Sequence, residues 1–147
     1  MNDLVITRVF RAGIDHVYSY ISEPAHILEW WGPEGMTVPA HDINLGKPGP
    51  WMSTMQASDG RKFTVSGDVT EVDPPRSVGF TWAWHDENGD RGPESRVSIE
   101  LETVGEATRF TLTHSGLADQ AAAESHMQGW TSSLAKLERK ILAERVN

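Results

Sequence analysis

The sequence contains no cysteine, which excludes disulfides, thiolate catalysis and cysteine-based zinc sites. It is also short of positive charge, because 13 Lys and Arg side chains stand against 21 Asp and Glu, a net charge of −8. The basic residues are scattered apart from a small group at 136–145, near the expected end of a helix, where cations complement the helix dipole. Since nucleic-acid binding requires a basic patch, we expect no nucleic-acid partner.

Long apolar runs are absent as well, since none approaches the roughly 20 residues that a membrane-spanning helix needs. The opening segment MNDLVITRVF is typical of a β-strand and not of a signal peptide. We therefore expect a cytoplasmic protein without membrane insertion. Its length favours a single domain over residues 1–147, in which folding buries roughly 70% of the unfolded chain's surface.

Tryptophan, in contrast, is abundant, with six residues in a chain of 147. They are Trp30, Trp31, Trp51, Trp82, Trp84 and Trp130. A tryptophan side chain buries a large apolar area and also carries an N–H that needs a hydrogen-bond acceptor. Such residues suit the wall of an apolar cavity as well as a solid core, and for Trp82 and Trp84 the sequence leaves both interpretations open.

Apolar and polar residues alternate through most of the stretch from Met36 to His114, which is typical of an antiparallel sheet with one buried face. The apolar sets are Phe63, Val65, Gly67 and Val69; Val78, Phe80, Trp82 and Trp84; Val97, Ile99 and Leu101; and Phe110, Leu112 and His114. A further strand is expected at 4–10, and two short helices follow it before Gly32-Pro33 ends the second.

A long amphipathic helix is expected from about Ala118 to Ala143. Its apolar residues recur at steps of three and four, which places them in one stripe. The stripe consists of Met127, Trp130, Leu134, Leu137 and Ile141. A sheet with one apolar face and a helix with one apolar stripe bury both surfaces when the sheet curls around the helix.

Several short motifs, in this order and spacing, resemble the START-like (SRPBCC) superfamily, and within it the activator of heat shock protein 90 ATPase homologue group. The motifs are Trp30-Trp31-Gly32-Pro33, Asp42 before a glycine-containing turn, Asp59-Gly60, Asp73-Pro74-Pro75-Arg76 leading into Phe80-Thr81-Trp82, Leu112-Thr113-His114-Ser115-Gly116, His126-Met127-Gln128-Gly129-Trp130, and Leu134 with Leu137. The resemblance implies an α+β helix-grip fold. In that fold a curved antiparallel sheet of six to seven strands wraps around a long C-terminal helix, with two short helices after the first strand.

The residues expected to face the space between sheet and long helix form a candidate ligand-binding site. They are Trp31, Trp51, Met55, Phe63, Val65, Trp82, Trp84, Phe110, His114, His126, Trp130 and Leu134. An apolar cleft with a few polar groups is the usual form of a small-molecule site. We therefore predict that the chain binds a small hydrophobic or aromatic molecule, as a carrier, sensor or sequestering protein.

His114 and His126 keep an enzymatic hypothesis open. The resemblance extends to polyketide cyclases, so one histidine could act as the acid–base group of a cyclase or dehydratase on a polyketide-like substrate. The alternative for each is a buried histidine whose ring nitrogens are hydrogen-bonded. The sequence shows no recognisable catalytic set, metal-binding spacing or cofactor motif, and we expect no cofactor and no metal.

The resemblance also implies a third hypothesis, a co-chaperone-like module that stimulates a chaperone ATPase in the stress response. It covers only the helix-grip domain, without the additional N-terminal domain of the eukaryotic activators, and we therefore do not expect a chaperone partner. Edge strands and the hairpin at 85–95 could support a homodimer, which nothing in the sequence selects.

Overall fold

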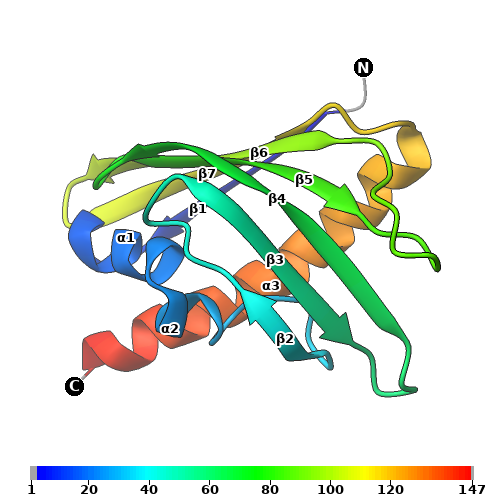
Figure 1. Ribbon diagram of the computed structural model, residues 1–147. Coiled ribbons are helices and arrows are strands. Elements are labelled where there is room, and N and C mark those ends of the chain that lie inside the picture. The colour runs from blue at the N-terminus through cyan, green and yellow to red at the C-terminus, as the bar shows by residue number, and fades with distance from the viewer. Residues whose placement is uncertain (1–2, 147) are drawn as a thin grey trace.

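A computed structural model describes residues 3–146, with side chains described as far as residue 143 (Figure 1). Its elements are β1 (Leu4–Phe10), α1 (Ile14–Ser22), α2 (Pro24–Ile27), β2 (Thr37–Asp42), β3 (Gly49–Gln56), β4 (Lys62–Asp73), β5 (Ser77–Trp84), β6 (Ser95–Val104), β7 (Ala107–Ser115) and α3 (Gln120–Val146). Within this range the strands form one seven-stranded antiparallel sheet in the order β1-β7-β6-β5-β4-β3-β2. The predicted helix-grip fold is confirmed.

The sheet curves over α3, and α1 and α2 lie beside the C-terminal half of that helix (Figure 1). Helix α3 begins two residues later than the sequence pattern suggests, because Asp119 caps it. The carboxylate of Asp119 accepts a hydrogen bond from the backbone N–H of Ala122 at 2.8 Å, which satisfies one of the free donors of the first turn. No helix in residues 3–146 has both the length and the apolar character needed to cross a membrane.

The apolar stripe of α3 faces the sheet as expected, with one exception. Trp130, Leu134, Leu137 and Ile141 are at most 5% exposed. Met127, expected in the same stripe, is 36% exposed, and that part of the prediction is wrong. It lies near Val5 of β1, an edge strand beyond which no further strand covers the helix.

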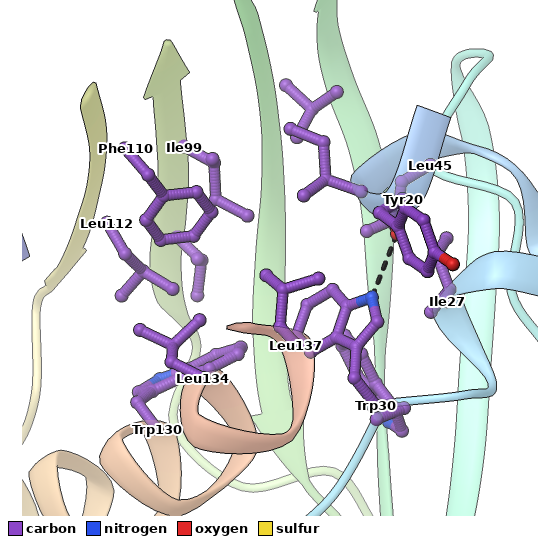
Figure 2. Close-up of a cluster of buried hydrophobic side chains, with 14 of the residues drawn as sticks. Tyr20, Ile27, Trp30, Leu45, Ile99, Phe110, Leu112, Trp130, Leu134 and Leu137 are labelled. Atoms are coloured by element: carbon purple, nitrogen blue, oxygen red, sulfur yellow. Dashed lines mark hydrogen bonds between the residues drawn. The ribbon is translucent and has the colours of Figure 1, made fainter. Parts of the chain in front are cut away.

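The C-terminal half of α3 packs into a filled core. Figure 2 shows Leu137 between Phe110 of β7 on one side and Ile27 and Trp30 of the α1–α2 region on the other. The indole N–H of Trp30 donates to the backbone carbonyl of Tyr20 at 2.8 Å, which ties the end of α2 to α1. Buried side chains therefore fill this part of the interior, beside α1 and α2.

Candidate functional site

A cavity of about 360 Å³, partly open to solvent, lies between the N-terminal half of α3, the inner face of β3–β5 and the segment after α2. It is lined by Trp31, Gly32, Pro33, Met36, Met55, Phe63, Trp82, Trp84, Ser125, His126, Gly129, Trp130 and Ser133. The lining combines a run after α2 with residues from three strands and from α3, so it exists only once the sheet has closed over the helix.

The structure places seven of the twelve predicted site residues in the cavity wall. These are Trp31, Met55, Phe63, Trp82, Trp84, His126 and Trp130. The other five lie behind the wall in the core, each at most 2% exposed, and do not line the cavity. These are Trp51, Val65, Phe110, His114 and Leu134. They share faces with the lining residues, but neighbouring side chains separate them from the open space.

Six lining residues are not among the predicted site residues, and five of these six carry a recognisable pattern in the sequence. Ser125, Gly129 and Ser133 recur every four positions and so share one face of α3. Gly32 and Pro33 belong to the motif that already stood out next to Trp31. Small residues on the helix face opposite aromatic strand residues leave unfilled volume, which is the pattern that could have identified them. Met36 carried no comparable signal.

All six tryptophans of the chain belong to one aromatic cluster. The ring of Trp82 lies at its centre, with centroids 5.2 Å from Trp130, 5.5 Å from Trp84, 5.6 Å from Trp51 and 5.9 Å from Trp31. Trp30 joins through Trp31 at 5.8 Å. The pairs are tilted or edge-to-face, the arrangements that aromatic quadrupoles favour. The cavity wall is thus continuous with the aromatic core behind it.

The indole N–H groups of the wall are turned toward acceptors within the protein. Trp31 donates to the hydroxyl of Ser53 at 2.9 Å, and Trp84 donates to Nε2 of His126 at 2.9 Å. Trp82 is different, because its Nε1 is buried without a hydrogen-bond partner among the described residues.

Trp51 is held in the core by a hydrogen bond to the backbone of β5. Its indole N–H donates to the backbone carbonyl of Thr81 at 3.1 Å, and Trp51 pairs directly with Gly67 in the sheet. A Cβ at position 67 would lie 2.0 Å from that carbonyl oxygen. Glycine is therefore required at 67 so that the Thr81 carbonyl can approach β4 and meet the indole.

His114 lies directly behind the cavity and serves as a hydrogen-bond acceptor for the helix. Its Nδ1 accepts from the indole N–H of Trp130 at 3.1 Å, so its proton resides on Nε2 and is donated to the hydroxyl of Ser95 at 2.7 Å. Ser95 in turn donates to the carbonyl of Trp82 at 3.2 Å. Burial, with a smaller contribution from the charge of nearby His126, lowers the pKa of His114 to about 3, and the ring stays neutral.

His126 lines the cavity, and both of its ring nitrogens are also engaged. Nε2 accepts from Trp84, which leaves the proton on Nδ1 for donation to the backbone carbonyl of Ala122 at 2.7 Å. Its ring centroid lies 4.8 Å from that of His114. The two histidines therefore satisfy indole N–H groups on two of the elements that enclose the cavity, Trp84 on β5 and Trp130 on α3.

Few polar groups of the lining stay unengaged, and none of the lining side chains is a carboxylate, lysine or arginine. Ser133 donates its hydroxyl to the carbonyl of Gly129 at 3.1 Å and keeps lone pairs that can accept. Ser125 is exposed at the rim. Over the described residues, no group of three or more potential metal ligands comes together.

Residues 11–141 match the family model described as activator of Hsp90 ATPase homolog 1-like protein. The chain belongs to this family. It is similar to the AHSA1 protein from Silicibacter pomeroyi, with 44% identity, coverage of 97% of this chain and 99% of that chain, and a TM-score of 0.93. The resemblance inferred from the Trp30–Pro33 and His126–Trp130 motifs is thereby confirmed.

More distant structures share the fold. A protein from Chromobacterium violaceum is 24% identical, with coverage of 95% of this chain and 96% of that chain and a TM-score of 0.82. A protein from Nitrosomonas europaea is 23% identical, with coverage of 99% and 97% and a TM-score of 0.80. At such identities the likeness concerns architecture alone. No protein with a curated description matches this chain.

Proposed function

We propose that the chain binds a small, uncharged, hydrophobic or aromatic molecule in the cavity between α3 and β3–β5. The cavity itself carries the proposal, because about 360 Å³ of space is lined by four indoles, a phenyl ring and two methionines. Small-molecule sites commonly measure roughly 300–1,000 Å³ and are predominantly apolar with a few polar groups. Methionine adds a wall that adapts to ligands of different shape.

The size of the cavity limits the ligand. About 360 Å³ lies near the lower end of the roughly 300–1,000 Å³ that small-molecule sites span. A planar molecule with three fused rings suits a site of this size better than a long-chain lipid does. The binding partner that fits is therefore a compact ring compound or a short, branched hydrocarbon derivative.

The chemistry of the wall supports an uncharged ligand. A charged group moved into the cavity would lose hydration without meeting an oppositely charged side chain, which is costly. The indole donors of Trp31, Trp84 and Trp130 are already paired within the protein. The hydroxyls of Ser125 and Ser133 on α3 are the polar groups that a ligand can reach, so one or two polar atoms on its helix-facing side would be matched.

The contacts of the two histidines favour binding over turnover. An acid–base catalyst needs a ring nitrogen that reaches the substrate. His114 does not line the cavity, and both of its nitrogens are bonded to protein groups. His126 lines the cavity, but its nitrogens are bonded to Trp84 and to the carbonyl of Ala122.

A chaperone partner, which the family's description suggests, is a separate hypothesis, and the cavity is not needed for it.

A direct test uses 1-aminoanthracene, an uncharged three-ring fluorophore. We expect saturable one-to-one binding, with energy transfer from the tryptophans that surround the cavity. Gly129→Leu should abolish binding, because its side chain projects into the space now lined by Gly129. Gln128→Leu adds the same side chain at an exposed position next to it and should bind normally. Binding that is unsaturable, or that survives Gly129→Leu in a folded protein, would contradict the proposal.

A further inference from the structure

The segment Gly32-Pro33-Glu34-Gly35, here named the flap, follows Trp31, and its first two residues line the cavity. Glycines in the left-handed region stand at both of its ends, with φ of +84° at Gly32 and +89° at Gly35. Other residues adopt a positive φ only with strain, whereas glycine adopts positive and negative φ about equally readily. The backbone can therefore pivot at both ends of a rigid proline-containing turn.

The residues that flank the flap are anchored independently of it. Trp31 is 3% exposed and donates its indole N–H to Ser53 at 2.9 Å. Met36, on the other side, packs against the buried core. These anchors hold the ends of the flap in place, so a movement of the four residues between them displaces Gly32 and Pro33 and leaves the rest of the cavity wall where it is.

Apolar contact between the flap and α3 is slight. Gly32 is buried and Pro33 is half-buried, while Glu34 and Gly35 are exposed. The Cγ of Pro33 lies 3.8 Å from the point where a Cβ on Gly129 would stand, so the ring covers a helix position that has no side chain. Lifting the flap would expose the Pro33 ring and the part of Met55 that Gly32 covers, which is a small apolar area, and the hydrophobic cost of opening is correspondingly low.

Polar contacts at the surface, here named the latch, hold the flap to α3. The backbone N–H of Glu34 donates to the hydroxyl of Ser132 at 2.9 Å, and the Glu34 carboxylate pairs with Arg139. The side chains of this ion pair are 53% and 60% exposed, and such pairs contribute only about 0–1 kcal/mol. Lys136 donates to the carbonyl of Trp31 at 3.4 Å, at the base of the flap.

We propose that the flap is a gate, which narrows the mouth of the partly open cavity when the latch forms and widens it to admit or release the ligand when the latch breaks. This inference rests on the proposed ligand binding and adds its regulation. Two glycine pivots, anchored flanks, little buried apolar surface and a weak polar latch together describe a segment that opens at low cost while its surroundings stay folded. The gate sets the rates of association and dissociation, and affinity depends on the aromatic wall.

A reversible cross-link tests the gate. The chain has no native cysteine, so Glu34→Cys with Ser132→Cys creates a single thiol pair across the latch, at neighbouring positions where the backbone nitrogen of Glu34 lies 2.9 Å from the Ser132 hydroxyl. In the oxidised protein we expect the association and dissociation rates of 1-aminoanthracene to fall at least about tenfold, with the dissociation constant changed less than about threefold. Reduction should restore both rates in the same sample.

Two controls separate the gate from a general effect of the substitutions. Thr54→Cys with Thr64→Cys places a cross-link between β3 and β4, where the two hydroxyls lie 2.8 Å apart, and should leave the rates unchanged. Ser132→Ala with Arg139→Gln removes both contacts of Glu34 with α3 and should raise both rates about three- to tenfold. Arg109→Gln breaks a similarly exposed ion pair with Glu102, in the β6–β7 hairpin, and should change neither rate.

Quenching of tryptophan fluorescence by acrylamide tests the gate without any ligand. We expect the quenching constant of the Glu34→Cys, Ser132→Cys protein to be lower when oxidised than when reduced. If 1-aminoanthracene does not bind at all, the proposed function fails, and the quenching measurement still decides the gate. If the dye binds but the cross-link alters neither its rates nor the quenching, the gate is wrong while the binding function stands.

Discussion

Trp130 of α3 donates its indole N–H to Nδ1 of His114 on β7 across 3.1 Å, which joins the helix to the sheet directly behind the cavity. This one bond determines which nitrogen of His114 carries the proton. The N–H of His114 is therefore at Nε2 and donates to the hydroxyl of Ser95. That hydroxyl in turn donates to the backbone carbonyl of Trp82. The cavity wall on the helix and the cavity wall on β5 are thus linked through a buried, neutral histidine.

The first prediction concerns pH. Burial lowers the pKa of His114 from 6.5 to about 3, so between these values the unfolded chain binds a proton that the folded chain does not. The contribution of His114 to stability is therefore complete above about pH 6.5 and declines as the pH falls, by up to about 1.4 kcal/mol per pH unit. Urea unfolding at pH 7, 6, 5 and 4 measures the slope.

The matched variant for this measurement is His114→Gln, whose amide can still accept from Trp130 and donate to Ser95 but does not titrate in this range. Other ionisable groups contribute equally to both proteins, so the difference between the two slopes isolates His114. Equal slopes for the two proteins would show that His114 does not carry the pH dependence.

The second prediction concerns the energetic coupling between His114 and Trp130. His114→Leu leaves the buried indole N–H of Trp130 without an acceptor, and we expect a loss of about 1–3 kcal/mol for that group. Trp130→Phe removes the donor. It should therefore lower the free energy of unfolding less in the His114→Leu protein than in the wild type. Denaturant unfolding of the four proteins of this double-mutant cycle gives the coupling, expected at about 1 kcal/mol. Strict additivity would contradict a direct bond.

The third prediction concerns Gly129, a glycine inside a helix. A Cβ at this position meets only Pro33, at an ordinary contact distance of 3.8 Å. Gly129→Ala should therefore stabilise the protein by about 0.5–1 kcal/mol through helix propensity, while the cavity loses no more than a methyl group. A thermal unfolding curve checks the gain. A destabilised Gly129→Ala protein would mean that α3 and the flap approach more closely than their contacts indicate.

The fourth prediction concerns Gly67. Gly67→Ala places a Cβ 2.0 Å from the carbonyl oxygen of Thr81, and that carbonyl cannot move away without weakening its bond from Trp51. We expect a loss of at least about 2 kcal/mol in the free energy of unfolding. Gly92→Ala is the control, because its Cβ has an ordinary 3.4 Å contact and its position is exposed. Similar stability of the two variants would argue against a steric requirement at 67.

Sequence periodicity predicted the architecture because it depends on local geometry. Alternation in β4–β7 assigned Val65, Phe80 and Phe110 to the buried face, and spacing of three and four assigned Leu134 to the buried stripe of α3. These patterns follow from the geometry of a strand and of a helix, and a single element is enough to display them. Met127 has the spacing of the stripe but is exposed, because the sheet ends at β1 and does not cover this position. Where the sheet ends is a property of the whole fold.

Tertiary structure alone decided which buried residues meet the cavity. Trp51 and Met55 lie on the same face of β3, yet Met55 lines the cavity and Trp51 is enclosed by the core. The sequence determined their face, because a two-residue period needs no partner. Whether space is left above each residue depends on what α1, α2 and α3 place there. Unfilled volume is what remains after all these segments have packed, so no single stretch of the chain encodes it.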